Sequence, residues 1–153
     1  MKALSAHPNI VGMKDSTGNV PQLAAFKAAT EGEDFEIFVG TASAWFPALT
    51  LDVIAGIHAS ANCAPNACAA VQQAFEAGDI VKARAIYQAL LPLNEAVTGT
   101  YGIAGLKYAA DLLGYTGGMV RCPLQPLNGA QKQALASIVE TAREQFQELG
   151  IRN

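Results

Sequence analysis

An alternation of short apolar segments with helical segments over the first sixty residues constrains the fold more than any other feature. Three apolar runs, each followed by turn-forming residues, predict strands at residues 10–14, 35–39 and 55–61. Between them, Asn19 is placed to cap one helix, and residues 45–51 predict a second, shorter helix. Strands separated by helices at this spacing are joined by right-handed crossovers. The sequence therefore predicts an α/β fold with a parallel sheet.

The remaining residues predict a succession of helices. Helices are expected at residues 65–77, 79–93 and 102–113, with glycine at several of their borders. The last helix begins after Asn128, and Gln131 is placed to reach back and complete a capping box. It carries one apolar stripe before Gly150: Leu135, Ile138, Val139, Ala142, Phe146 and Leu149. We therefore expect a helical region after the sheet.

Composition excludes several classes of function. Of the 153 residues, 51% are hydrophobic and 15% are charged, which indicates a domain with a core rather than a disordered segment. A net charge of −3 predicts no nucleic-acid partner and no anionic membrane surface. No apolar run reaches the ~20 residues that span a bilayer, and the N-terminus has no signal-peptide core. Three cysteines without CxxC spacing and two histidines predict no metal site and a reduced, cytoplasmic setting.

Lys14 is the residue with the clearest chemical potential. It ends an apolar run that we expect to be buried on both faces, as parallel strands usually are. Desolvation at such a position favours the neutral amine, which can attack a ketone and form an imine. The alternative is a strand-end lysine whose amine reaches solvent, and sequence physics alone favours this alternative.

Two further residues are expected near the Lys14 amine. Side chains at alternate positions of a strand share a face, so Ser16 should point the same way as Lys14. Gly40 ends the next strand, where its backbone can approach a ligand closely. For each residue taken alone, ordinary turn chemistry is the stronger explanation.

Four segments resemble the dihydrodipicolinate synthase / N-acetylneuraminate lyase family, in the same order along the chain. They are residues 7–18 (HPNIVGMKDSTG), 38–41 (FVGT), 56–62 (GIHASAN) and 120–124 (VRCPL). Three later segments are most similar to the 4-hydroxy-2-oxoglutarate aldolase branch: residues 94–98 (NEAVT), 101–107 (YGIAGLK) and 114–118 (GYTGG). The resemblance extends over essentially the whole chain.

The resemblance implies a role for each candidate residue. Lys14 would form the imine with pyruvate or another 2-keto acid, and Ser16 would belong to the substrate-binding shell. Gly40 would line the keto-acid pocket, and the backbone carbonyl of Ile57 would orient the ligand. Neither a metal nor an organic cofactor is implied. His58 is expected on the strand face opposite Ile57, where a packed or hydrogen-bonded structural role is favoured over catalysis.

The family fold is a (β/α)₈ barrel, and the resemblance assigns only its C-terminal portion to this chain. Residues 1–62 would supply about the last three strands, and residues 63–153 the final barrel helix and a C-terminal helical region, all in one structural unit. The first five strands would be absent, together with the tyrosine that relays protons. Met1, followed directly by the tail of a helix, favours truncation of a longer ancestor.

Sheet edges left unpaired need a partner, so we expect a homo-oligomer or a complementing N-terminal barrel fragment. The leading hypothesis is a Schiff-base lyase or aldolase, resembling 4-hydroxy-2-oxoglutarate aldolase or dihydrodipicolinate synthase, that is poorly active by itself. A non-catalytic oligomerisation or binding module derived from the family is the alternative. A third hypothesis is an independently rewired small α/β domain.

Overall fold

The sheet predicted from the sequence is present in the computed structural model, which describes residues 1–152. Three parallel strands lie in the order β1 (Gly12–Asp15), β2 (Glu36–Val39) and β3 (Ala55–Gly56). The register pairs Lys14 with Phe38, and Phe38 in turn with Ala55. The α/β fold class is therefore confirmed, with β1 and β3 at the two edges of the sheet.

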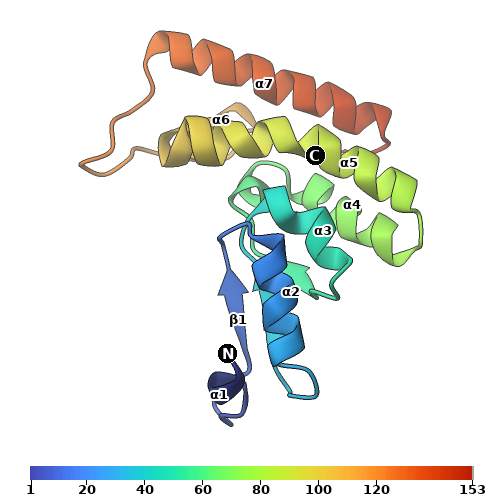
Figure 1. Ribbon diagram of the computed structural model, residues 1–153. Coiled ribbons are helices and arrows are strands. Elements are labelled where there is room, and N and C mark those ends of the chain that lie inside the picture. Colours follow the sequence, from blue (N-terminus) through green and yellow to red (C-terminus); the bar gives the residue numbers. More distant parts are fainter. Residues whose placement is uncertain (153) are drawn as a thin grey trace. The chain divides into compact units, whose positions relative to one another are not determined.

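Helices connect the strands and cover one face of the sheet. The described elements before β3 are α1 (Lys2–Ser5), α2 (Val20–Ala29), the 3₁₀ turn η1 (Ala42–Ala44) and α3 (Trp45–Leu49). Figure 1 shows α2 lying alongside β1. Leu23 of α2 and Ile37 and Val39 of β2 are fully buried and form the core of this region. The predicted cap of α2 is confirmed, because the Asn19 side chain accepts a hydrogen bond from the Gln22 amide.

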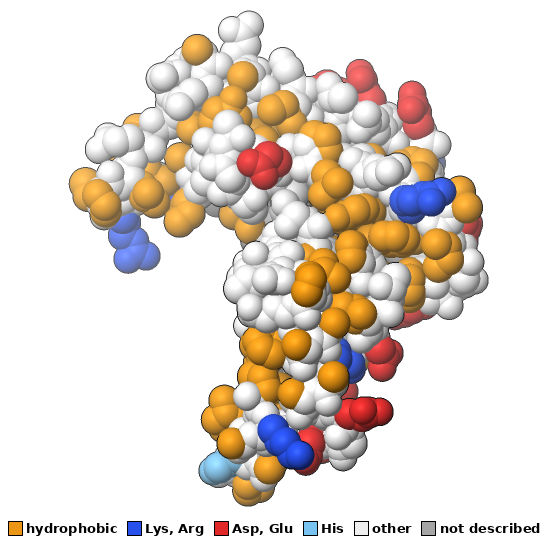
Figure 2. Space-filling view, viewed as in Figure 1, with side chains coloured by type: hydrophobic (Ala, Val, Ile, Leu, Met, Phe, Trp, Pro, Cys, Tyr) orange, Lys and Arg blue, Asp and Glu red, His pale blue; other side chains and the backbone are white. Residues whose placement is uncertain are grey.

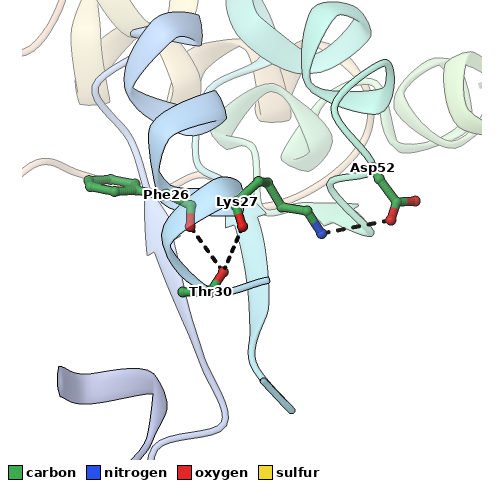
Figure 3. A network of polar contacts seen from close by, with 4 residues as sticks. All are labelled: Phe26, Lys27, Thr30 and Asp52. Carbon is green, nitrogen blue, oxygen red and sulfur yellow. Dashed lines mark hydrogen bonds and ion pairs between the residues drawn. The ribbon is translucent and has the colours of Figure 1, made fainter. Parts of the chain in front are cut away.

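A polar network fixes the end of α2 to the loop before β3 (Figure 3). The Thr30 hydroxyl donates to the backbone carbonyls of Phe26 and Lys27, at 3.0 and 3.3 Å. The Lys27 amine lies 3.8 Å from a carboxylate oxygen of Asp52. Asp52 is almost fully exposed, so this ion pair contributes at most about 1 kcal/mol.

The third strand is much shorter than predicted. We expected residues 55–61 to be extended, but the strand contains only Ala55–Gly56 and is followed by the 3₁₀ turn η2 (Ala59–Asn62). The Ile57 amide makes one more ladder bond, to the Val39 carbonyl at 2.9 Å. Beyond this point the Ser60 carbonyl accepts bonds from the amides of residues 63 and 64, so the chain coils toward the next helix. Local hydrogen bonding therefore ends the strand early.

The second part of the chain is helical, as predicted. It contains α4 (Pro65–Glu76), α5 (Ile80–Glu95), the π-helix η3 (Ala96–Thr100), α6 (Gly102–Leu112) and α7 (Gly129–Glu148). Within this part, α7 runs beside α5 and α6 (Figure 1). The capping box of α7 is confirmed in both directions between Asn128 and Gln131. Four members of the predicted stripe are buried: Leu135, Val139, Ala142 and Phe146.

The chain divides into two compact units, Met1–His58 and Ala59–Asn153. All three strands belong to the first unit, and the helices from α4 onward belong to the second. The sequence placed the border between sheet and helical region a few residues later, after residue 62. Among residues 1–152, no helix is both long enough and apolar enough to span a membrane.

Candidate active site

Lys14 lies in the second half of β1 with its side chain exposed. The expectation that this run would be buried on both faces is wrong, because Val11 is 70% exposed and Gly12 and Met13 are only partly covered. β1 is an edge strand, so its outer side has no neighbouring strand to cover it. The amine of Lys14 is therefore accessible to small molecules.

Gly40 brings the side chains of Lys14 and Ser16 together at the carboxyl end of the sheet. A Cβ atom built at Gly40 would lie 2.6 Å from Cε of Lys14 and would overlap Oγ of Ser16. The two side chains therefore occupy the space that any other residue at this position would fill. The Gly40 amide also donates to the Asp15 carbonyl at 2.6 Å, which extends the β1–β2 ladder to this point. Lys14, Ser16 and Gly40 thus form one cluster.

Asp15, between the two clustered side chains, faces the other way and fixes the turn that follows β1. Its carboxylate is buried and accepts hydrogen bonds from the Thr17 amide at 2.7 Å and the Gln22 side chain at 3.3 Å. Gln22 belongs to α2, so the end of the strand is attached to the next helix. Because neighbouring side chains of a strand point to opposite faces, this anchoring holds Lys14 on the open face.

Two hydroxyl residues beside the cluster were not singled out from the sequence. Gly18 has a φ of 72°. An ideal Cβ atom built on it would lie 3.4 Å from the Thr41 methyl and 3.6 Å from Oγ of Ser43. The two hydroxyls are 2.9 Å apart and hydrogen-bonded. The turns after β1 and β2 therefore pack together. Thr41 belongs to the segment 38–41 that resembles the family, but neither hydroxyl was given a role from the sequence.

Ile57 and His58 follow the short third strand and have opposite environments. The Ile57 side chain is 51% exposed, while His58 is only 7% exposed. The imidazole lies edge-to-face with the Trp45 indole, with 5.0 Å between ring centroids. This packed position agrees with the structural role favoured for His58. Burial is the main cause that lowers the pKa of His58 to about 4, and the positive charge of Lys14 lowers it further.

The two largest of the cavities described here lie away from Lys14. One cavity of about 480 Å³ in the first unit is lined by Lys27, Glu36 and Asp52, toward the amino ends of the strands. A second, of about 540 Å³, belongs to the helical unit and has Lys107 in its wall. The Lys107 amine donates to the Gly117 carbonyl at 2.6 Å, which gives it a structural partner. Lys14 and Ser16 are both exposed on the first unit.

The geometry supports one type of chemistry. An exposed primary amine beside a hydroxyl, at the carboxyl end of parallel strands, can add to the carbonyl carbon of a small ketone. The carboxyl ends of parallel strands are also where ligands bind in α/β proteins. Cys63 differs from such a reactive group, because burial raises the pKa of its thiol to about 12.

Comparison with known proteins gives a consistent result. The sequence profile of the Dihydrodipicolinate synthetase family matches residues 1–142. The 4-hydroxy-tetrahydrodipicolinate synthase of Acidiphilium cryptum is 40% identical over 132 residues, which cover 86% of this chain and 45% of that protein. The chain thus spans about half the length of the curated relatives it matches.

Solved structures agree with the sequence comparison. Dihydrodipicolinate synthase from Bacillus anthracis superposes with a TM-score of 0.85 at 26% identity, covering 90% of this chain and 47% of that one. YagE, a prophage protein of the dihydrodipicolinic acid synthase family from Escherichia coli K12, gives a TM-score of 0.80 at 25% identity. That match covers 99% of this chain and 52% of YagE, whose structure was determined in complex with pyruvate.

Proposed function

The chain belongs to the dihydrodipicolinate synthetase family, and we propose that it carries the imine-forming half of a pyruvate-dependent lyase or aldolase. The observation that carries the proposal is the cluster of Lys14, Ser16 and Gly40 at the carboxyl end of the sheet. The pyruvate bound by YagE supports a 2-keto acid as the ligand of this cluster.

In the proposed reaction, the unprotonated Lys14 amine adds to the ketone carbon of pyruvate. A proton moves from nitrogen to oxygen to give a carbinolamine, whose hydroxyl takes up a second proton from solvent and leaves as water, so that a protonated imine remains. Loss of a proton from the methyl group gives an enamine, whose terminal carbon forms a bond with an aldehyde carbon. The aldehyde oxygen takes up a proton, and hydrolysis of the imine releases the product and restores the amine. Cleavage of a 4-hydroxy-2-keto acid is the same sequence reversed.

The neighbours of Lys14 have distinct proposed roles. Ser16, which shares the space beside Gly40 with Lys14, would bind the keto acid through its hydroxyl. Gly40 would leave room for the ligand and for both side chains, because a methyl group there would occupy the same space. The backbone carbonyl of Ile57, at the end of the neighbouring ladder, would accept a hydrogen bond and orient the ligand.

We further propose that the chain corresponds to the C-terminal portion of the barrel and needs a complement. It covers 45% of the Acidiphilium relative, and within residues 1–152 the sheet ends at the edge strands β1 and β3. Apolar side chains also gather over α1 in Figure 2, where Leu4 is half exposed. A second copy of the chain or a polypeptide with the preceding strands would cover these surfaces.

Two branches of the family are candidates for the substrate. The relatives matched here are named 4-hydroxy-tetrahydrodipicolinate synthase. Residues 94–98, 101–107 and 114–118 instead favour a 4-hydroxy-2-oxoglutarate aldolase. The half-length match also favours a second candidate function, a non-catalytic binding or oligomerisation module of the same family.

Turnover with and without the complement tests the proposal. Pyruvate release from 4-hydroxy-2-oxoglutarate would be measured for the chain alone and after assembly with the first half of the Acidiphilium relative. We expect the complement to raise turnover by at least about 10²–10⁴-fold, the usual contribution of general acid–base groups. Lys14→Ala should abolish the gain, whereas Lys27→Ala, at the other end of the sheet, should not. A rate of about 10 s⁻¹ for the chain alone would refute the need for a complement.

A further inference from the structure

The imidazole of His58 is buried without a hydrogen-bond partner. Its side chain is 7% exposed, and neither Nδ1 nor Nε2 is paired within residues 1–152. An unpaired polar group in the interior costs about 1–3 kcal/mol, which an apolar side chain of similar size would avoid. A buried, unsatisfied polar residue therefore calls for an explanation beyond stability.

Two neighbours hold the ring in place. The Trp45 indole packs against it at 5.0 Å between centroids, with an angle of 61° between the ring planes. The ring also occupies the space beside the α-carbon of Gly56, where an added Cβ would overlap both Nε2 and Cε1. The ring therefore fits only while residue 56 is glycine. Trp45 begins the helix that follows β2, so the ring also connects the ends of two neighbouring strands.

The ring belongs to the residue that follows Ile57, whose carbonyl is proposed above to orient the ligand. Ile57 precedes His58 directly, and its amide is held by the Val39 carbonyl at 2.9 Å. The ladder therefore fixes one end of residue 57, and the wedged ring of the next residue fixes the other. The carbonyl of residue 57 changes direction when the planar peptide unit turns about ψ of residue 57 and φ of residue 58, and a ring held in place at residue 58 restricts this turn.

We propose that His58 is a positioning residue, whose ring, wedged between Trp45 and Gly56, fixes the direction of the Ile57 carbonyl beside the Lys14 site. The proposal rests on the function proposed above, because it concerns orientation of the same keto acid. His58 acts through Ile57 and does not touch the substrate. An uncharged ring suits this place, because the protonated imine at Lys14 is positive. Burial and the Lys14 charge keep the ring neutral at neutral pH by lowering the pKa of His58.

Borohydride trapping over a range of pyruvate concentrations tests the proposal. The two quantities measured are the pyruvate concentration at half-maximal labelling of Lys14 and the maximal labelling. His58→Ala should raise the half-maximal pyruvate concentration about tenfold, which is the effect of losing one well-oriented hydrogen bond. The maximal labelling should stay unchanged. His58→Phe keeps an aromatic ring against Trp45 and should restore a value near that of the wild type. His7→Ala alters the chain's other histidine, which is exposed, and should have no effect.

Gly56→Ala provides an independent arm, because its methyl group would displace the His58 ring. It should raise the half-maximal concentration as His58→Ala does, and the double variant G56A/H58A should be no worse than H58A alone. An unchanged concentration in both single variants, with the wild type labelled normally, overturns the role of His58 but leaves the proposed function intact. If the wild type is never labelled, the proposed function and this inference fall together. If H58A does not fold, as judged by circular dichroism, G56A and H58F decide the question.

Discussion

Acidification should destabilise the protein through His58. Its pKa is about 4 in the folded chain, against 6.5 for a free imidazole, chiefly because the ring is buried. Between these two pH values the unfolded chain binds a proton that the folded chain does not. Stability therefore rises with pH across this window and is fully present above the unfolded value.

The difference of pKa sets the size of the effect. Each pKa unit corresponds to about 1.4 kcal/mol, so the shift of His58 is equivalent to about 3 kcal/mol of unfolding free energy between pH 7 and pH 4. This is a large share of the 5–15 kcal/mol that is typical of folded domains. It should be visible as a lower midpoint of unfolding in urea.

The assay compares wild type with His58→Phe in urea at a series of pH values. Carboxylates titrate in both proteins, so their effect largely cancels in the difference of unfolding free energies. As the pH falls from 7 to 4, the unfolding free energy of the wild type should fall by about 3 kcal/mol relative to that of H58F. Parallel pH profiles for the two proteins would show that the imidazole is not held neutral by burial, and the reasoning about His58 would be refuted.

Three further predictions concern the cluster, the last helix and the exposed edges. Gly40→Ala should abolish pyruvate labelling, because its methyl group would take the space of Lys14 and Ser16. Gly129→Ala is the control and should leave labelling intact, because an added Cβ there meets nothing within 4 Å. Asn128→Ala removes the capping box of α7 and should lower the free energy of unfolding by about 1 kcal/mol in a thermal melt. Light scattering should show association at high concentration, since edge strands and apolar surface need cover, and a well-behaved monomer would contradict this.

The sequence predicted the elements whose borders depend on local chemistry. Asn19 and the pair Asn128 and Gln131 cap their helices as expected, because side chain to backbone bonds over three residues are encoded locally. The first two strands were placed to within two residues for the same reason: turn-forming residues bound them. The third strand was overextended, because Ser60 accepts bonds that only the coiled chain can make.

The π-helix shows a second limit of the periodic pattern. The helix predicted to end at residue 93 runs to Glu95 and continues as η3, with Pro92 inside α5. The Thr98 hydroxyl donates to the Asn94 carbonyl at 2.6 Å. A hydrogen bond from a side chain to a backbone carbonyl does not alter the spacing of apolar residues. The sequence pattern therefore did not predict that the helix continues beyond residue 93.

At the candidate site, the sequence predicted which residues meet but not how exposed they are. Alternation along β1 placed Lys14 and Ser16 together, and the structure brings both against Gly40. The expectation that the run ending at Lys14 is buried was wrong, because burial depends on neighbouring strands and β1 is an edge strand in this chain. The alternative, an amine that reaches solvent, agrees with the exposed side chain of Lys14. The contact between His58 and Trp45 joins residues far apart in the sequence and had no local signal.

Lys14 is proposed to form an imine with a 2-keto acid, and peptide mapping after reduction tests this directly. The protein would be incubated with pyruvate and borohydride, digested, and analysed by mass spectrometry. We expect a pyruvate-dependent mass addition on the peptide that contains Lys14, absent in Lys14→Ala and retained in Lys27→Ala. Labelling that persists unchanged in Lys14→Ala, or that falls equally on the exposed lysines, would contradict it.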